Sequence, residues 1–118
     1  ATVMTEPGLI VYRFDAPLVF ANAAFFTERL EALVANAGTD LKCVILAAEP
    51  ISDFDSTAAE ALETLDADLE RIGVDLWIAR ANGPLRQLLT ATGLTKRLGA
   101  EHIFPSVRAV VTAYREQP

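Results

Sequence analysis

The sequence of 118 residues has little of several things that particular classes of protein require. It contains one cysteine, Cys43, so no disulfide can form within the chain, which is typical of proteins from a reducing compartment. Its longest apolar runs, residues 16–21 and 43–48, are far shorter than the ~18 residues of a membrane-spanning helix. The sequence has no basic segment followed by a long apolar segment, so no secretory signal is predicted. We therefore expect a cytoplasmic domain without disulfides.

Basic charge is also scarce, because 10 Lys and Arg stand against 16 Asp and Glu for a formal net charge of -6. Binding to nucleic acid depends on cations that neutralise phosphates, so we expect no nucleic-acid partner. The acidity is concentrated in residues 49–70, which contain eight acidic residues and no basic one, whereas residues 71–118 contain seven basic and three acidic residues. An acidic block of this kind usually forms the solvated face of a helix.

The hydrophobic residues, 52% of the chain, follow alternating strand and helix patterns. Apolar runs predict strands at residues 9–14, 18–21, 43–47, 74–79 and 103–104, of which the first two form a hairpin. Helical spacing predicts helices that follow Asn22, Thr57, Asn82 and Pro105. This order predicts an α/β fold with a mixed, mostly parallel sheet, an opening hairpin and helices packed against the sheet. The length predicts one domain over residues 1–118.

The acidic segment is predicted to be an amphipathic helix. Its buried stripe is predicted to consist of Ala58, Leu62, Leu65, Leu69 and Ile72. Thr57, followed three residues later by Glu60, fits a capping box at the start of the helix. Further along the chain, residues 95–101 are predicted to be a polar link.

The chemically distinctive residues are 53–57, Asp-Phe-Asp-Ser-Thr. The pattern Asp-x-Asp-x-Thr is similar to the nucleophile motif of haloacid-dehalogenase-like phosphatases, which also need a lysine and a downstream acidic pair for magnesium. Here residues 49–52 separate the motif from the strand, and the only downstream lysine is Lys96. We therefore expect neither catalytic residues nor a metal site. Cys43 and His102 are expected to be structural.

A different interpretation of the same segment makes Ser56 a phosphate acceptor or a contact for a partner. A phosphate would add about -1.5 to -2 charges at the start of the helix, where the helix dipole favours negative charge. Asp53, Asp55 and Glu60 would repel it. The expected effect is a change in how a partner docks.

The order of elements, with Asp55-Ser56-Thr57 at the start of the second helix, resembles the STAS domain. This domain is shared by bacterial anti-sigma factor antagonists and by the cytoplasmic C-terminal part of SulP anion transporters. Residues 11–23 (VYRFDAPLVFANA), 79–86 (ARANGPLR) and 103–110 (IFPSVRAV) are similar to the transporter branch.

The resemblance implies a non-catalytic regulatory module of a transporter for sulfate or a related anion. The chain would be a C-terminal cytosolic fragment at the cytoplasmic face of the membrane. Its partners would be the transmembrane domain of the same transporter and cytosolic regulatory proteins. Ser56 falls where the antagonists carry their phosphorylated serine, so the alternative is a free-standing anti-sigma factor antagonist switched by phosphorylation of Ser56.

Two candidate sites follow from the residues and the resemblance together. The first is a partner surface at Asp53, Asp55, Ser56, Thr57, Glu60, Glu63 and Glu70. The second is a weaker contact for an anion or a nucleotide at Arg80, Asn82, Gly83 and Arg86. The sequence has no glycine-rich phosphate-binding loop, so a nucleotide site would be unconventional and no cofactor is expected.

Overall fold

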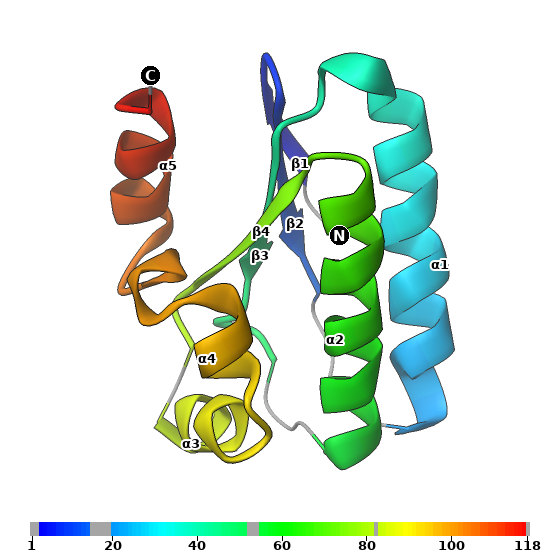
Figure 1. Cartoon of the computed structure of the whole chain (residues 1–118), viewed down its shortest axis with the longest axis vertical. Coiled ribbons are helices and arrows are strands. Elements are labelled where there is room, and N and C mark those ends of the chain that lie inside the picture. Colours follow the sequence, from blue (N-terminus) through cyan, green and yellow to red (C-terminus); the bar gives the residue numbers. More distant parts are fainter. Residues whose placement is uncertain (1–2, 15–19, 52–54, 82, 118) are drawn as a thin grey trace.

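The computed structural model describes residues 3–14, 20–51, 55–81 and 83–117, and these form one five-stranded sheet with helices on both faces (Figure 1). The strands are β1 (Val3–Glu6), β2 (Leu9–Arg13), β3 (Cys43–Ala47), β4 (Asp75–Ala79) and β5 (Ile103–Phe104), and they lie side by side in this order. β1 pairs antiparallel with β2, and every later pair is parallel. The predicted α/β class and mostly parallel sheet are confirmed.

The opening hairpin is present, but its strands are not the predicted ones. β2 pairs with β1, which precedes it, across a turn in which Gly8 has a φ of 81°. Residues 20 and 21, predicted to end the second strand, instead begin helix α1 (Phe20–Ala37). Asn22 therefore lies inside this helix and does not cap it, and the predicted turn at residues 15–17 falls outside the described residues.

The two faces of the sheet carry two separate cores. Helices α1 and α2 (Ser56–Arg71) lie side by side on one face, and α5 (Val107–Arg115) covers the opposite face (Figure 1). Leucines of α3 (Gly83–Ala91) and α4 (Leu94–Leu98) pack into the first core. Successive strand residues point to opposite faces. Val44 and Leu46 therefore join the core beneath α1 and α2, whereas Ile45 and Trp77 join the core beneath α5.

The predicted stripe of α2 is correct except at its end. Ala58, Leu62, Leu65 and Leu69 are buried, but Ile72 is 61% exposed. The helix stops at Arg71, and Ile72 leaves helical geometry with φ -102° and ψ 12°. Helical spacing therefore no longer applies at position 72, and Gly73 turns the chain toward β4 with a φ of 75°.

The segment predicted to be a polar link contains α4 and a short 3-10 helix, Ala100–His102. Leu94 and Leu98 of α4 are buried in the core, but five residues are too few for a helical period to be visible in the sequence. The predicted strand at residues 103–104 and the helix that follows are confirmed. Among the described helices, none has the length and apolar character needed to span a membrane.

Candidate functional site

Asp55 caps the start of α2. Its backbone is extended, with φ -116° and ψ 177°, and its carboxylate accepts a hydrogen bond from the Ala58 N–H at 2.9 Å. Its carbonyl accepts a second one from the Ala59 N–H at 3.0 Å. The predicted capping box is therefore wrong, because Thr57 is already the second residue of the helix. Asp53, the other predicted acid here, lies outside the described residues.

Removing this cap is expected to weaken the start of α2. Asp55→Ala should lower the free energy of unfolding by about 1 kcal/mol, whereas Asp55→Asn, which keeps an acceptor, should lose far less. Urea denaturation of the two variants measures the difference. Ser106→Ala is a matched control, because Ser106 caps α5 in the same way through the Ala109 N–H at 3.0 Å. Equal losses for the Ala and Asn variants would instead assign the effect to the charge of Asp55.

One exposed face of α2 carries the predicted partner residues. Ser56, Glu60, Glu63 and Glu70 are all exposed, and their spacing of four, three and seven residues places them in one row along the helix. We name this row the α2 acidic face. The serine stands at its N-terminal end, directly after the capping aspartate.

Four of the eight acidic residues between positions 49 and 70 pair with arginines, and all three of these arginines come from the basic residues 71–118. The pairs are Glu49 with Arg80 at 3.0 Å, Asp66 with Arg97 at 2.7 Å, Glu70 with Arg97 at 3.6 Å, and Asp68 with Arg71. Glu60 and Glu63 have no ion-pair partner among the described residues. The unneutralised charge of the α2 acidic face therefore lies in its N-terminal half, next to Ser56.

The pair between Asp66 and Arg97 joins α2 to α4. The Asp66 side chain is only 13% exposed, and burial raises its pKa although the hydrogen bond from Arg97 acts in the opposite direction. Asp66 is thus part of the packing between these helices. It does not belong to the free surface of α2.

A groove between α1 and α2 adjoins the α2 acidic face. It is lined by Thr57 and Ala61 from α2 and by Ala23, Ala24, Thr27 and Glu28 from α1. Phe25, next to this lining, is 57% exposed, which is unusual for a large apolar side chain. Small side chains in the groove leave room for a side chain of a partner. The sequence did not indicate this feature, because it depends on how two helices pack.

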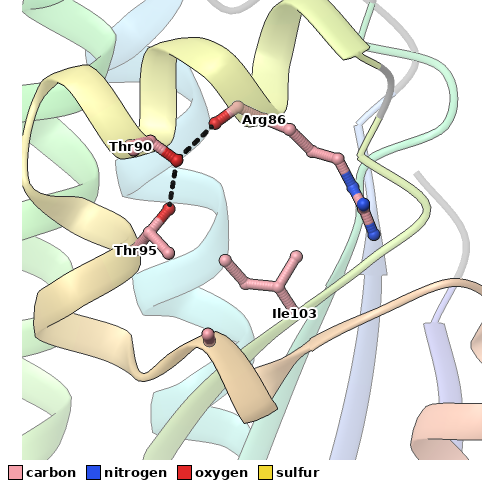
Figure 2. Close-up of a pocket in the computed structure, with 5 residues that line it drawn as sticks. Arg86, Thr90, Thr95 and Ile103 are labelled. Carbon is pink, nitrogen blue, oxygen red and sulfur yellow. Dashed lines mark hydrogen bonds between the residues drawn. The ribbon is translucent and has the colours of Figure 1, made fainter.

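The residues predicted to contact an anion are divided between two places. Arg80 follows β4 with a φ of 60°, donates its N–H to the Phe104 carbonyl at 2.9 Å and pairs with Glu49. Arg86 lies one turn into α3 and lines a pocket with Thr90, Thr95, Ala100 and Ile103 (Figure 2). Gly83 begins α3, and Asn82 lies outside the described residues.

Cys43 and His102 are both held within the fold. Burial, together with the negative charge of Asp75, raises the pKa of the Cys43 thiol to about 12, so the thiol stays neutral. A neutral thiol is a poor nucleophile. The His102 ring stacks on Trp77 at 5.2 Å, and its Nδ1 lies 2.6 Å from the Leu98 carbonyl oxygen. Across the described residues, no three His, Cys, Asp or Glu side chains gather where they could hold a metal ion.

The five-stranded sheet with helices on both faces places the chain in the class of small α/β domains, here with an exposed serine directly after the aspartate that caps the second helix. A family model of the STAS domain matches residues 1–110, and the chain belongs to this family. The predicted resemblance to the STAS domains of SulP transporters is confirmed as well.

Proteins similar to this chain include transporters and an anti-sigma factor antagonist. The chain is 39% identical over 111 residues to a probable sulfate transporter of Mycobacterium tuberculosis, covering 94% of this chain and 20% of that protein. The murine Slc26a9 anion transporter is 22% identical, with a TM-score of 0.86 over 97% of this chain and 19% of that one. An anti-sigma factor antagonist from Mycobacterium paratuberculosis is 19% identical, with a TM-score of 0.78 over 98% of this chain and 92% of that one. The chain thus spans about a fifth of the length of the curated relative.

Proposed function

We propose that this chain is the cytosolic regulatory module of a SulP-type transporter for sulfate or a related anion, and that it is not itself catalytic. The observation that carries the proposal is the 39% identity to a probable sulfate transporter over 94% of this chain. The other four-fifths of that relative would correspond to the transport path, so this chain would be one domain of a larger protein. It would lie at the cytoplasmic face of the membrane.

The α2 acidic face is the surface that we propose contacts the transmembrane part. Cytoplasmic loops of membrane proteins carry an excess of Lys and Arg. Glu60 and Glu63 present two exposed carboxylates that no arginine of the described chain neutralises. Complementary charges of this kind favour one docking orientation over others. The adjoining groove at Thr57 and Ala61 would accept an apolar side chain from the same loop.

Reversing these charges in the full-length transporter tests the proposal. The double variant Glu60→Lys, Glu63→Lys is expected to change the rate of sulfate uptake by roughly 5-fold or more, since juxtaposed like charges cost several kcal/mol at an interface. The isolated domain should keep its stability to within about 0.5 kcal/mol, as exposed substitutions do. Uptake into proteoliposomes and urea denaturation provide the two readouts.

The matched control reverses two exposed acids elsewhere, Glu101→Lys and Glu116→Lys, with the same change in net charge. Uptake should stay near that of the unmodified transporter. If both double variants changed uptake equally, the effect would come from net charge. If neither changed it, the α2 acidic face would not be the contact.

The second candidate function is a free-standing anti-sigma factor antagonist, which the similarity of fold to such a protein favours. It requires that Ser56, exposed at the start of α2, accept a phosphate. Incubation with ATP and an anti-sigma factor kinase, followed by mass spectrometry, would find one phosphate that Ser56→Ala removes. Ser106→Ala is the control, because Ser106 also stands at the start of a helix. Absence of modification under conditions that phosphorylate a known antagonist would exclude this candidate.

A further inference from the structure

A small pocket lies where α3, α4, the 3-10 helix and β5 meet. It shares no residue with the α2 acidic face. Its lining consists of Arg86, Thr90, Thr95, Ala100 and Ile103, and its volume is about 230 Å³ (Figure 2). Pockets for drug-sized ligands usually have volumes of about 300–1,000 Å³. This pocket therefore suits a ligand of only a few heavy atoms.

One end of the pocket presents hydroxyl oxygens as acceptors. The Thr90 hydroxyl donates to the Arg86 carbonyl at 3.1 Å. A hydroxyl has one proton, so in the 3.2 Å contact between the Thr90 and Thr95 hydroxyls the donor is Thr95. The Thr95 oxygen keeps its lone pairs for a further donor. A ligand that reaches this end is expected to bring an O–H or N–H group.

The other end of the pocket presents donors. The Arg86 guanidinium lies across Ile103 from the two threonine hydroxyls (Figure 2). It forms no ion pair with any described residue, in contrast to Arg80 and Arg97. A guanidinium offers five N–H donors and no acceptor, and its planar shape matches a carboxylate. Ile103 provides an apolar surface between the two ends, and Ala100 also lines the pocket.

We propose that this pocket binds a small organic acid that also carries a hydroxyl or amino group. The carboxylate would pair with Arg86, a short aliphatic stem would lie against Ile103, and the hydroxyl or amino group would donate to Thr95. This ligand is an effector bound to the domain. The proposal does not depend on which ion the larger protein transports, and it applies equally if the chain acts alone.

Titration of the chain, followed by the amide NMR signals of Thr95, Ala100 and Ile103, tests the proposal with four probes. The probes are γ-hydroxybutyrate, which has both groups, butyrate, which lacks the hydroxyl, butanol, which lacks the carboxylate, and inorganic sulfate. γ-Hydroxybutyrate is expected to bind tightest, and butyrate roughly 3- to 10-fold more weakly, the usual worth of one neutral hydrogen bond. Butanol and sulfate should give no saturable shifts at these residues.

Three variants assign the ends of the pocket. Arg86→Gln should weaken γ-hydroxybutyrate by roughly 10-fold or more, because a hydrogen bond to a charged group is lost. Thr95→Val should weaken γ-hydroxybutyrate but leave butyrate unchanged. Arg108→Gln, which removes an exposed arginine on α5, should change nothing. Urea denaturation of each variant confirms that it folds.

Several results would overturn the proposal. Sulfate binding as tightly as γ-hydroxybutyrate would show a general attraction of anions to arginine. An equal effect of Arg108→Gln would place the binding elsewhere. Failure of folded Arg86→Gln to weaken γ-hydroxybutyrate, or absence of saturable shifts with any probe, would also contradict it.

Discussion

Between pH 9 and pH 12, the free energy of unfolding is expected to fall by up to about 1.4 kcal/mol per pH unit through Cys43 alone, because its pKa rises from 9.0 to about 12 on folding. Burial is the main cause: Cys43 is 1% exposed in the middle of the sheet, and Asp75 adds to the effect. The folded state therefore keeps a proton that the unfolded chain releases. The contribution to stability is complete below pH 9 and is lost as the pH rises to 12. The total is about 4 kcal/mol.

Urea denaturation at a series of alkaline pH values measures this loss. Cys43→Ala removes the titrating group, so its stability should fall less steeply with pH, although the cavity lowers its stability at every pH. Some slope should remain, because burial also raises the pKa of Tyr12. Parallel curves for the unmodified chain and Cys43→Ala would contradict the prediction.

Replacing Tyr12 with Phe is expected to stabilise the fold by about 1–3 kcal/mol. Tyr12 is fully buried, its ring lies 5.4 Å from that of Phe26, and its hydroxyl has no hydrogen-bond partner among the described residues. A buried hydroxyl without a partner costs the free energy of removing it from water. Phe keeps the ring contacts and removes this cost.

Tyr114→Phe is the matched control, since it deletes the same atom from a satisfied site. The Tyr114 hydroxyl donates to the Pro7 carbonyl at 2.7 Å, so its loss should destabilise the fold by about 1 kcal/mol. The two substitutions should therefore have opposite signs in urea or thermal denaturation. Destabilisation by Tyr12→Phe would mean that its hydroxyl has a partner in solution.

The sequence predicted the features that depend on a local pattern. The apolar run at residues 43–47 predicted a strand, and β3 at these residues is buried along its whole length. Helical spacing also predicted the helix that follows Pro105, and Val107, Val110, Val111 and Tyr114 of that helix belong to the core beneath α5. The opening hairpin was misplaced, because residues 18–21 are too few to separate a strand from the start of a helix.

At the candidate site, position along the chain was predictable but partners were not. The sequence located the acidic block and the serine at the start of α2. It could not distinguish Glu60, which has no described ion pair, from Asp66, whose partner Arg97 lies 31 residues away. It grouped Arg80 with Arg86 because they are near in sequence, although Arg80 pairs with Glu49 and Arg86 lines a pocket. Contacts between distant residues decide which charges remain available.

The spatial order of the strands, which equals their order in the sequence, also bears on how the chain assembles during synthesis. Each strand that leaves the ribosome finds its neighbour already made, so the sheet can grow by addition at one edge. The last helix is the exception, because Tyr114 reaches back 107 positions to the hairpin at Pro7. Until α5 has been translated, the side of the sheet with Trp77 and Ile45 lacks its cover. Helix α5 therefore completes the folding of this sheet, and a ribosome that stops before residue 107 leaves an aggregation-prone surface.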